Sequence, residues 1–201
     1  MTFLAATFFA VMAFAQTADE IVARMEQEMD KHEKDGLIMT IDAKIPILGT
    51  MTTKSYALGD KTRTEGEMMG VKFVTWTDGK TEWTYTAKDN TIEIENQKGG
   101  SESESDAEMF TGLTDDYDVS IKKETADAWY LLCKKSKTNT DKDAPKTNDL
   151  VVSKKNYYPV SLSAKMSGVT MKLYGISFGV SEKQVTFNAA DYPNAKIVDK
   201  R

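Results

Sequence analysis

The stretch TWTDGKTEWTYTAKDNTIEI, from Thr75 to Ile94, decides the fold of this 201-residue chain. The pair Asp78-Gly79 separates two runs of alternating side chains, and an Asp-Gly pair in that setting is the strongest short signal for a β-hairpin. After this turn, Trp83 and Tyr85 alternate with polar residues, which is the period of a strand with one apolar face. The centre of the chain is therefore expected to be a run of antiparallel hairpins.

The period of two continues toward the N-terminus. In residues 37–45 an apolar side chain occupies every second position, and most of the positions between them are polar. Pro46 follows, so the pattern is typical of a half-buried strand that ends at residue 45. Residues 49–58, 61–67 and 71–77 are expected as the next three strands. The N-terminal part of the chain thus predicts four strands before the Asp78-Gly79 turn, the fourth being the first strand of that hairpin.

A helix is expected ahead of these strands, over residues 17–35. Thr17 and Glu20 have the spacing of a capping box, in which each side chain bonds to the backbone of the other residue. The apolar residues recur at helical spacing, as an amphipathic helix requires: Ile21, Met25 and Met29. Gly36 is expected as the C-terminal stop.

Toward the C-terminus the pattern breaks once and then resumes. An acidic loop over residues 99–106 precedes a short helix expected over residues 106–113, which carries Met109, Phe110 and Leu113. The further strands are expected at 118–123, 128–134, 149–154, 159–167, 169–174 and 184–187. About ten or eleven strands with regular turn signals predict an antiparallel sandwich or barrel, and the length suits one domain.

The apolar segment 1–15 carries no charge and ends in Ala13-Phe14-Ala15, which is typical of a secretory signal peptide. A buried N-terminal helix is the alternative. We expect the mature domain to span residues 16–201, to be soluble in the compartment that it enters and to escape lipidation, since no cysteine stands at the cleavage site. The net charge of −5 argues against non-specific binding to nucleic acid or to anionic lipid surfaces.

Catalytic and metal-binding patterns are missing from the sequence. One histidine, His32, and one cysteine, Cys133, leave too few ligands for the usual zinc sites. Cys133 lies in an apolar run and is expected to be a small buried side chain. The sequence has no phosphate loop, no serine-hydrolase elbow and no dinucleotide fingerprint. We therefore expect no enzyme activity, no catalytic residues, no metal and no cofactor.

Nine methionines follow residue 15, and three tryptophans lie in expected strands. Methionine fills a core, and it also suits a surface that accepts varied apolar ligands, so both interpretations stand. The expected helices are too small to cover the whole sheet, which predicts a residual apolar cavity. Its expected lining shares one face of the sheet: Leu37, Met39, Ile41, Trp83, Tyr85, Ile92, Ile94, Leu162, Met166 and Met171.

The hairpin from Thr75 to Ile94 resembles the strand–turn–strand segment of periplasmic outer-membrane lipoprotein carriers of the LolA type. The ending VTFNAADYPNAKIVDKR, from Val185 to Arg201, is similar to the C-terminal strand and tail of Bacteroidetes members. The resemblance implies a curved antiparallel half-barrel, an incomplete β-barrel, whose helices lie over an apolar cavity. It also implies that the lid is formed by Met109, Phe110 and Leu113, and that Arg63 latches the lid through hydrogen bonds to its backbone.

Two functions follow from this resemblance. The first is a monomeric periplasmic carrier that shields acyl chains of lipoproteins or lipids between membrane-bound donor and acceptor proteins. The alternative is an envelope-stress regulatory or scaffold module on the same fold, which acts through protein–protein contacts. A secreted hydrolase is a weaker third interpretation, because no cluster of carboxylates points to it.

Overall fold

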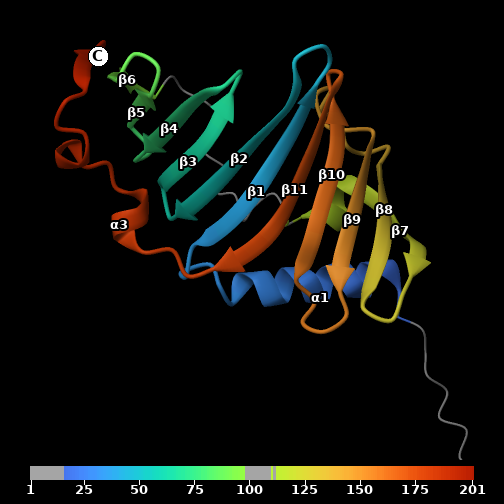
Figure 1. Cartoon of the computed structure of the whole chain (residues 1–201). Helices are drawn as coiled ribbons and strands as arrows, with labels where there is room; N and C mark the ends of the chain where they lie inside the picture. The colour runs from blue at the N-terminus through green and yellow to red at the C-terminus, as the bar shows by residue number, and fades with distance from the viewer. Residues whose placement is uncertain (1–15, 98–109, 111) are drawn as a thin grey trace, which may run out of the picture.

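The computed structural model describes residues 16–97, 110 and 112–201, and the expected signal peptide 1–15 lies outside the described residues. Within them, one sheet holds all the strands, and helices pack against it (Figure 1). The helices are α1 (Ala18–Asp30), α2 (Leu113–Asp116) and α3 (Glu182–Val185), with a 3-10 turn at Ala189–Asp191. The strands are β1 (Leu37–Ile45), β2 (Gly49–Leu58), β3 (Lys61–Met68), β4 (Val71–Thr77), β5 (Thr81–Thr86), β6 (Thr91–Asn96), β7 (Tyr117–Glu124), β8 (Ala128–Lys135), β9 (Thr147–Ser153), β10 (Pro159–Met166), β11 (Val169–Phe178) and β12 (Lys196–Asp199).

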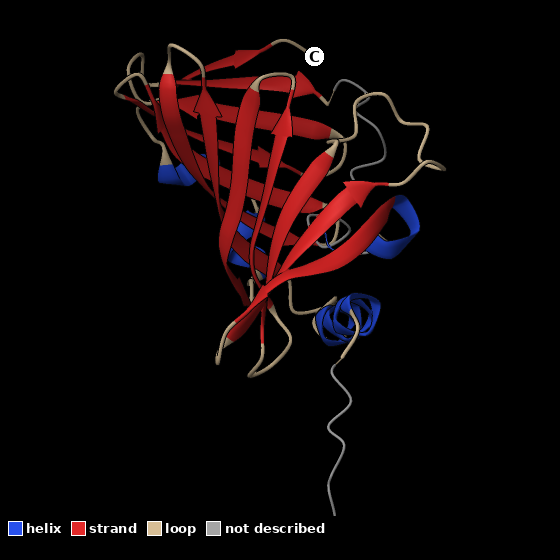
Figure 2. Cartoon of the chain, turned by 90° about the vertical axis from the view of Figure 1, so that its right-hand side faces the viewer, coloured by secondary structure: helices blue, strands red, loops and turns tan. Residues whose placement is uncertain are grey.

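The sheet is curved and does not close on itself (Figure 2). Its order is β12-β6-β5-β4-β3-β2-β1-β11-β10-β9-β8-β7, so two meanders meet where β1 pairs with β11. Every pair is antiparallel except β12, which lies parallel to β6. The expected mainly antiparallel half-barrel is thereby confirmed, with twelve described strands rather than ten or eleven.

Helix α1 begins as expected and ends earlier. The Thr17 hydroxyl accepts from the Glu20 backbone N–H at 3.2 Å, and the Glu20 carboxylate accepts from the Thr17 N–H at 2.9 Å. The helix stops at Asp30 and not at residue 35, because the apolar stripe ends at Met29 and hydrogen-bonded turns follow. Gly36 has a φ of +70°, and an added Cβ would lie 2.6 Å from the Ala57 carbonyl oxygen, so only glycine fits.

Cross-strand pairing assigns every strand residue to one of two faces. We call the side against which α1 packs the helix face; it carries Leu37, Met39 and Ile41 of β1. The opposite side is the tail face, because residues 181–192 cover it at β2 to β5. The main core lies between α1, α2 and the helix face, and a smaller one joins Tyr56, Val180 and Val185 on the tail face.

The sheet also has two distinct ends. One end, which we call the turn end, carries the β1–β2, β3–β4, β5–β6 and β10–β11 turns together with residues 136–146. Helix α1 crosses the sheet near the other end, where the β9–β10 turn contacts it (Figure 1).

Two expected elements differ from the structure. Of the helix expected at 106–113, residues 106–109 and 111 lie outside the described part of the chain, and α2 begins only at Leu113. The strand expected at 184–187 is the helix α3 instead. Ser181 and Gln184 form a capping box there, and this local signal outweighs the short apolar run.

Candidate functional site

The apolar layer beneath α1 is the first part of the candidate site. Helix α1 contributes Ile21, Val22 and Met25, all 0% exposed, and Met29. The sheet side comes from β1 and β8 to β11, which form one cluster with the helix: Leu37, Met39, Trp129, Leu131, Cys133, Leu150, Val152, Leu162 and Leu173. Each of these strands has an apolar residue at every second position. Because alternate side chains share a face, each strand places one row of apolar side chains under the helix.

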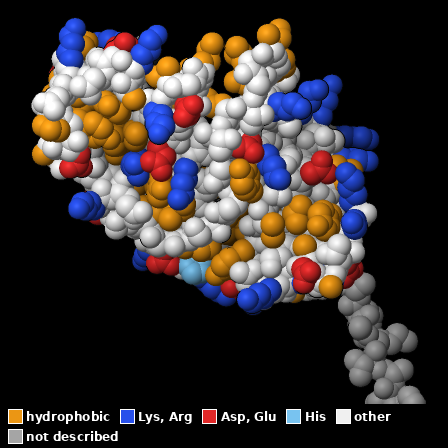
Figure 3. All heavy atoms as spheres, viewed as in Figure 1, with side chains coloured by type: hydrophobic (Ala, Val, Ile, Leu, Met, Phe, Trp, Pro, Cys, Tyr) orange, Lys and Arg blue, Asp and Glu red, His pale blue; other side chains and the backbone are white. Residues whose placement is uncertain are grey.

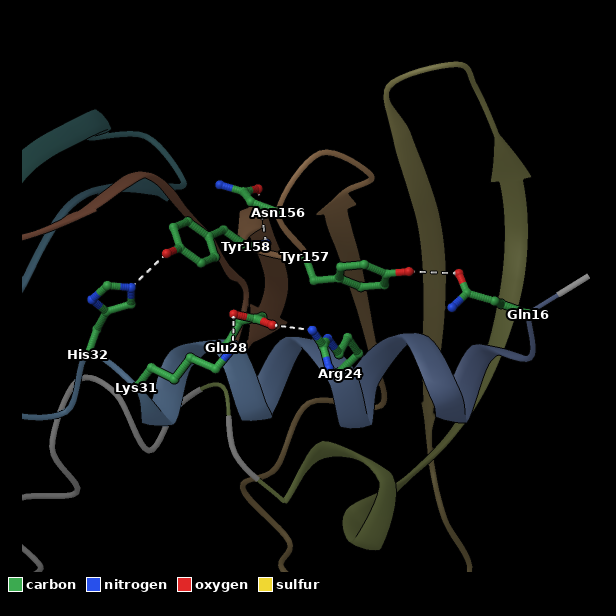
Figure 4. A network of polar contacts seen from close by, with 8 residues as sticks. All are labelled: Gln16, Arg24, Glu28, Lys31, His32, Asn156, Tyr157 and Tyr158. Carbon is green, nitrogen blue, oxygen red and sulfur yellow. Dashed lines mark hydrogen bonds and ion pairs between the residues drawn. The ribbon is translucent and has the colours of Figure 1, made fainter.

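Polar contacts fix α1 at both of its ends (Figure 4). At its start, the Tyr157 hydroxyl donates to the Gln16 side-chain oxygen at 3.1 Å. At its end, His32 Nε2 lies 2.6 Å from the Tyr158 hydroxyl, and the His32 ring stacks on Phe178 at 4.2 Å. The two tyrosines are adjacent in the β9–β10 turn, so one turn clamps the whole helix.

Tyr157 is held in an unusual conformation by this clamp. Its φ of +58° is rare for a bulky side chain. Its ring packs on Trp129 at 5.2 Å, and the Arg24 guanidinium lies 5.8 Å from the ring centroid. One strained backbone position therefore lies where the sheet grips α1. His32 is a half-buried part of this grip.

Phe110 and Leu113 complete the cover of the helix face. Both are buried, at 0% and 6% exposure, and belong to the same cluster as α1. Met109, expected beside them, lies outside the described residues. The Glu26 carboxylate of α1 accepts from the Leu113 backbone N–H at 3.3 Å. Burial raises the pKa of Glu26, and the bonds from the backbone N–H groups of Leu113 and Gly112 oppose that shift.

Cys133 lies on the helix face of β8, opposite Val119 of β7 and Asn148 of β9. It is 0% exposed, as expected of a small buried side chain. Burial raises the pKa of its thiol to about 11. The thiol is therefore unreactive while the cover formed by α1 and Phe110 is closed.

The apolar surface continues from this closed core toward the turn end. Along β1, Met39 is buried, Ile41 and Ala43 are half-buried, and the same gradient runs along β10 from Leu162 to Met166, which is 38% exposed. We call the outer part the apolar strip: Ile41, Ala43, Met51, Ala164, Met166, Val169 and Met171. Register places all of these on the helix face.

The other half of the helix face is rich in hydroxyl groups. Ser55, Thr64, Thr75 and Thr84 are successive cross-strand neighbours on β2 to β5. Thr75 Oγ1 and Thr84 Oγ1 lie 3.3 Å apart. This half offers hydrogen bonds and little apolar area, so it is a poor surface for acyl chains.

The expectation that ten cavity residues share one face is wrong. Leu37, Met39, Ile41, Leu162, Met166 and Met171 lie on the helix face, whereas Trp83, Tyr85, Ile92 and Ile94 lie on the tail face. The apolar side of the strands changes faces between β1 and β5. Residues 187 and 192 explain the change, because Trp83 stacks on Phe187 at 5.4 Å and Tyr85 lies 4.5 Å from the Tyr192 ring.

The expectation that Arg63 latches the lid is also wrong. Arg63 lies on the tail face of β3, away from Phe110 and Leu113 on the helix face. Its Nη2 atom binds Glu65 Oε2 at 2.6 Å, and its guanidinium lies 5.3 Å from the Tyr56 ring centroid. Arg63 and Trp76 line a cavity of about 280 Å³ together with side chains from residues 181–192. Sequence reasoning missed this tail-face cluster, whose signal was the pair of aromatic residues at 187 and 192.

No metal-binding group of three or more His, Cys, Asp or Glu side chains occurs in residues 16–97, 110 and 112–201. In the same residues, none of the helices has the length and apolar character needed to span a bilayer.

Comparison with known proteins supports the fold. No family model and no curated protein matches the sequence. A solved structure of an uncharacterized conserved protein from Thermus thermophilus is 17% identical, with a TM-score of 0.51 over 91% of this chain and 99% of that one. A LolA superfamily protein from Nitrosomonas europaea is 12% identical over 86% and 99%, with a TM-score of 0.36. The Pseudomonas aeruginosa MucA/MucB complex is 14% identical over 86% and 61%, with a TM-score of 0.42.

These likenesses concern the fold alone. The open antiparallel sheet with a helix against one face agrees with the half-barrel that the hairpin resemblance predicts.

Proposed function

We propose that the protein is a non-enzymatic periplasmic carrier that shields acyl chains of lipids or lipoproteins on the apolar half of its helix face. The cover formed by α1 and Phe110 would be displaced by the cargo. One observation carries the proposal: a single apolar surface runs from the closed core under α1 to the half-exposed apolar strip. A core that only stabilises a fold has no reason to extend to solvent in this way.

The energies of cover and cargo are similar. Burying the four apolar side chains of α1 is worth about 1.5–3 kcal/mol each, or about 6–12 kcal/mol together. An acyl chain gains about 0.8 kcal/mol per buried CH₂, on the order of 10 kcal/mol for a long chain. Exchange between helix and acyl chain is therefore close to balanced, as reversible loading requires.

The residues of the cover suit such an exchange. Met25, Met29 and Met39 belong to the buried cluster of the helix face, and methionine adapts to irregular apolar shapes at little cost. The polar clamp at Tyr157 and Tyr158 sits at the opposite end from the apolar strip, so α1 has a fixed side about which it can tilt.

The experiment is to bind a fluorescent fatty acid to the purified domain 16–201 and to extract its copurified lipid for mass spectrometry. Met39→Asp places a charge at the centre of the buried face and is expected to abolish probe binding. Trp83→Ser on the tail face is the matched control and should leave it unchanged. Probe binding that responds to Trp83→Ser and not to Met39→Asp would refute the assignment of the site.

A second candidate function rests on the hydroxyl-rich half of the helix face. The half-buried Thr64, Thr75 and Thr84 suit a polar partner such as a peptide, as a regulatory or scaffold module would need. Copurified lipid and probe binding favour the carrier, whereas a bound protein partner without lipid favours the regulatory module.

A further inference from the structure

Two turns at the turn end carry large apolar side chains in full contact with water. Ile47 and Leu48 of the β1–β2 turn are 105% and 64% exposed, and Met68 and Met69 at the β3–β4 turn are 53% and 83% exposed. No contact within the described part of the chain buries them. Figure 3 shows apolar side chains at the upper margin of the molecule, where Figure 1 places the β1–β2 turn.

The backbone at these turns makes the choice of residue more unusual. Ile47 has a φ of +72° and Met69 a φ of +52°, in the left-handed region that a β-branched or bulky side chain rarely adopts. The β10–β11 turn offers a direct comparison. Like Met69-Gly70 of the β3–β4 turn, Ser167-Gly168 has two successive residues with positive φ, but its first residue is a serine, a small polar residue of the kind usual in turns.

Strain and exposure therefore coincide at Ile47 and Met69. Both features cost stability in the isolated chain, and neither is offset by packing in the folded molecule. Residues kept under such conditions indicate a role outside the chain.

Lysines gather beside these turns. Lys135, Lys142, Lys146 and Lys165 line a surface cavity of about 570 Å³, together with the β10–β11 turn, and Asp143 is the one acidic residue in its lining. Lys44 and Lys165 both pair with Thr170 of the strand between them, so their backbones lie about 10 Å apart. The chain as a whole has a net charge of −5, whereas the side chains that line this cavity carry a positive net charge.

We propose that the turn end docks on the surface of a bilayer that contains anionic lipid, with Ile47, Leu48, Met68 and Met69 inserted among the acyl chains. The lysines would bind the phosphate groups of the lipids, since long lysine side chains reach the headgroups while apolar neighbours insert. The four apolar side chains stand on two separate narrow turns rather than on one flat patch. A fluid bilayer accepts such projections, whereas a protein partner would need a matching pocket for each.

The orientation that follows is specific. The turn end faces the lipid, the apolar strip opens toward it, and α1 with its clamp lies at the far end. Docking does not depend on the carrier role, because vesicle binding and probe binding in solution are separate measurements and either can fail alone.

The test is co-sedimentation of the domain 16–201 with vesicles of phosphatidylglycerol and phosphatidylcholine in equal parts, and with vesicles of phosphatidylcholine alone. Binding to the anionic vesicles only, and its loss in high salt, are expected. Ile47→Ser with Leu48→Ser should weaken it by about tenfold or more. Lys142→Gln with Lys165→Gln should weaken it by about fivefold for each lysine.

Two control variants lie at the opposite end. Val160 is also an exposed apolar residue, at 47%, and Lys183 is an exposed lysine of α3. Val160→Ser and Lys183→Gln should leave vesicle binding unchanged. The proposal is overturned if the wild-type domain binds neither kind of vesicle, or if the control variants weaken binding as much as the variants of the turn end.

Discussion

Phe110→Ala tests whether the cover of the helix face opens on its own. The Phe110 side chain is 0% exposed, so its truncation should destabilise the closed state by about 3–5 kcal/mol, as for other buried phenylalanines. If the cover moves as a unit, this free energy acts on the equilibrium between closed and open cover. Each 1.4 kcal/mol is a factor of ten, so the open population should rise by about 100-fold or more.

Cys133 provides the assay without further engineering, because it is the only cysteine of the chain and is buried in the same cluster. Its alkylation by a maleimide requires the cover to open. In Phe110→Ala the rate of alkylation should rise by the same factor as the open population. This rate should be nearly independent of urea at low concentration, since a local opening exposes little surface. The matched control is Val185→Ala, which truncates a residue that is 1% exposed in the tail-face core.

The reasoning is refuted if labelling in Phe110→Ala follows the urea dependence of global unfolding. It is refuted equally if Val185→Ala accelerates labelling to the same extent. Either outcome would mean that α1 and Phe110 separate from the sheet only when the whole domain unfolds.

Three further predictions concern single residues. The raised pKa of Glu26 means that the folded state holds its proton more tightly than the unfolded state, so the stability that this group contributes should be present at acid pH and fall as pH rises above about 4.5; Glu26→Gln should remove this part of the pH dependence in urea titrations. Ile47→Asn should raise the melting temperature, because asparagine accepts positive φ and relieves about 1 kcal/mol of strain, and calorimetry measures it. Phe187→Ala should expose Trp83 and shift tryptophan fluorescence to the red while leaving maleimide labelling of Cys133 unchanged, and coupled changes would contradict the separation of the two faces.

Much of the fold could be predicted because its signals are local. Alternation of side chains located the strands from β1 to β6, and the Thr17 capping box located α1. The Asp78-Gly79 turn was likewise visible in four residues. These features depend on neighbours in the sequence, so the sequence shows them directly.

The side of the sheet that each apolar row faces could not be predicted. Alternation shows that Trp83 and Tyr85 share a face, but not whether that face meets α1 or another cover. The answer depends on Phe187 and Tyr192, which lie about a hundred residues away in the chain and pack on the opposite side. The misplacement of Arg63 has the same cause, because Arg63 shares the tail face with Trp76.

The gathering of lysines at the turn end was hidden for a related reason. In the sequence Lys44, Lys142 and Lys165 are scattered, and the net charge is negative. Only the pairing of β1, β10 and β11 brings Lys44 and Lys165 to the same end. The expectation that net charge disfavours anionic lipid considers the molecule as a whole and misses this local surface.

The pairing of β1 with β11 also sets the order in which the chain can fold. The hairpins from β2 to β6 and from β7 to β10 join neighbouring residues, whereas Leu37 and Phe178 pair across most of the chain. Pairing over such a sequence distance is slow, because the entropy of closing the loop is lost before contacts form. Helix α1 packs on β1 and on β8 to β11, so its full docking needs the two meanders to be joined. A newly made chain therefore keeps its apolar helix face exposed until its last quarter is available, and this interval is when it most needs protection from aggregation.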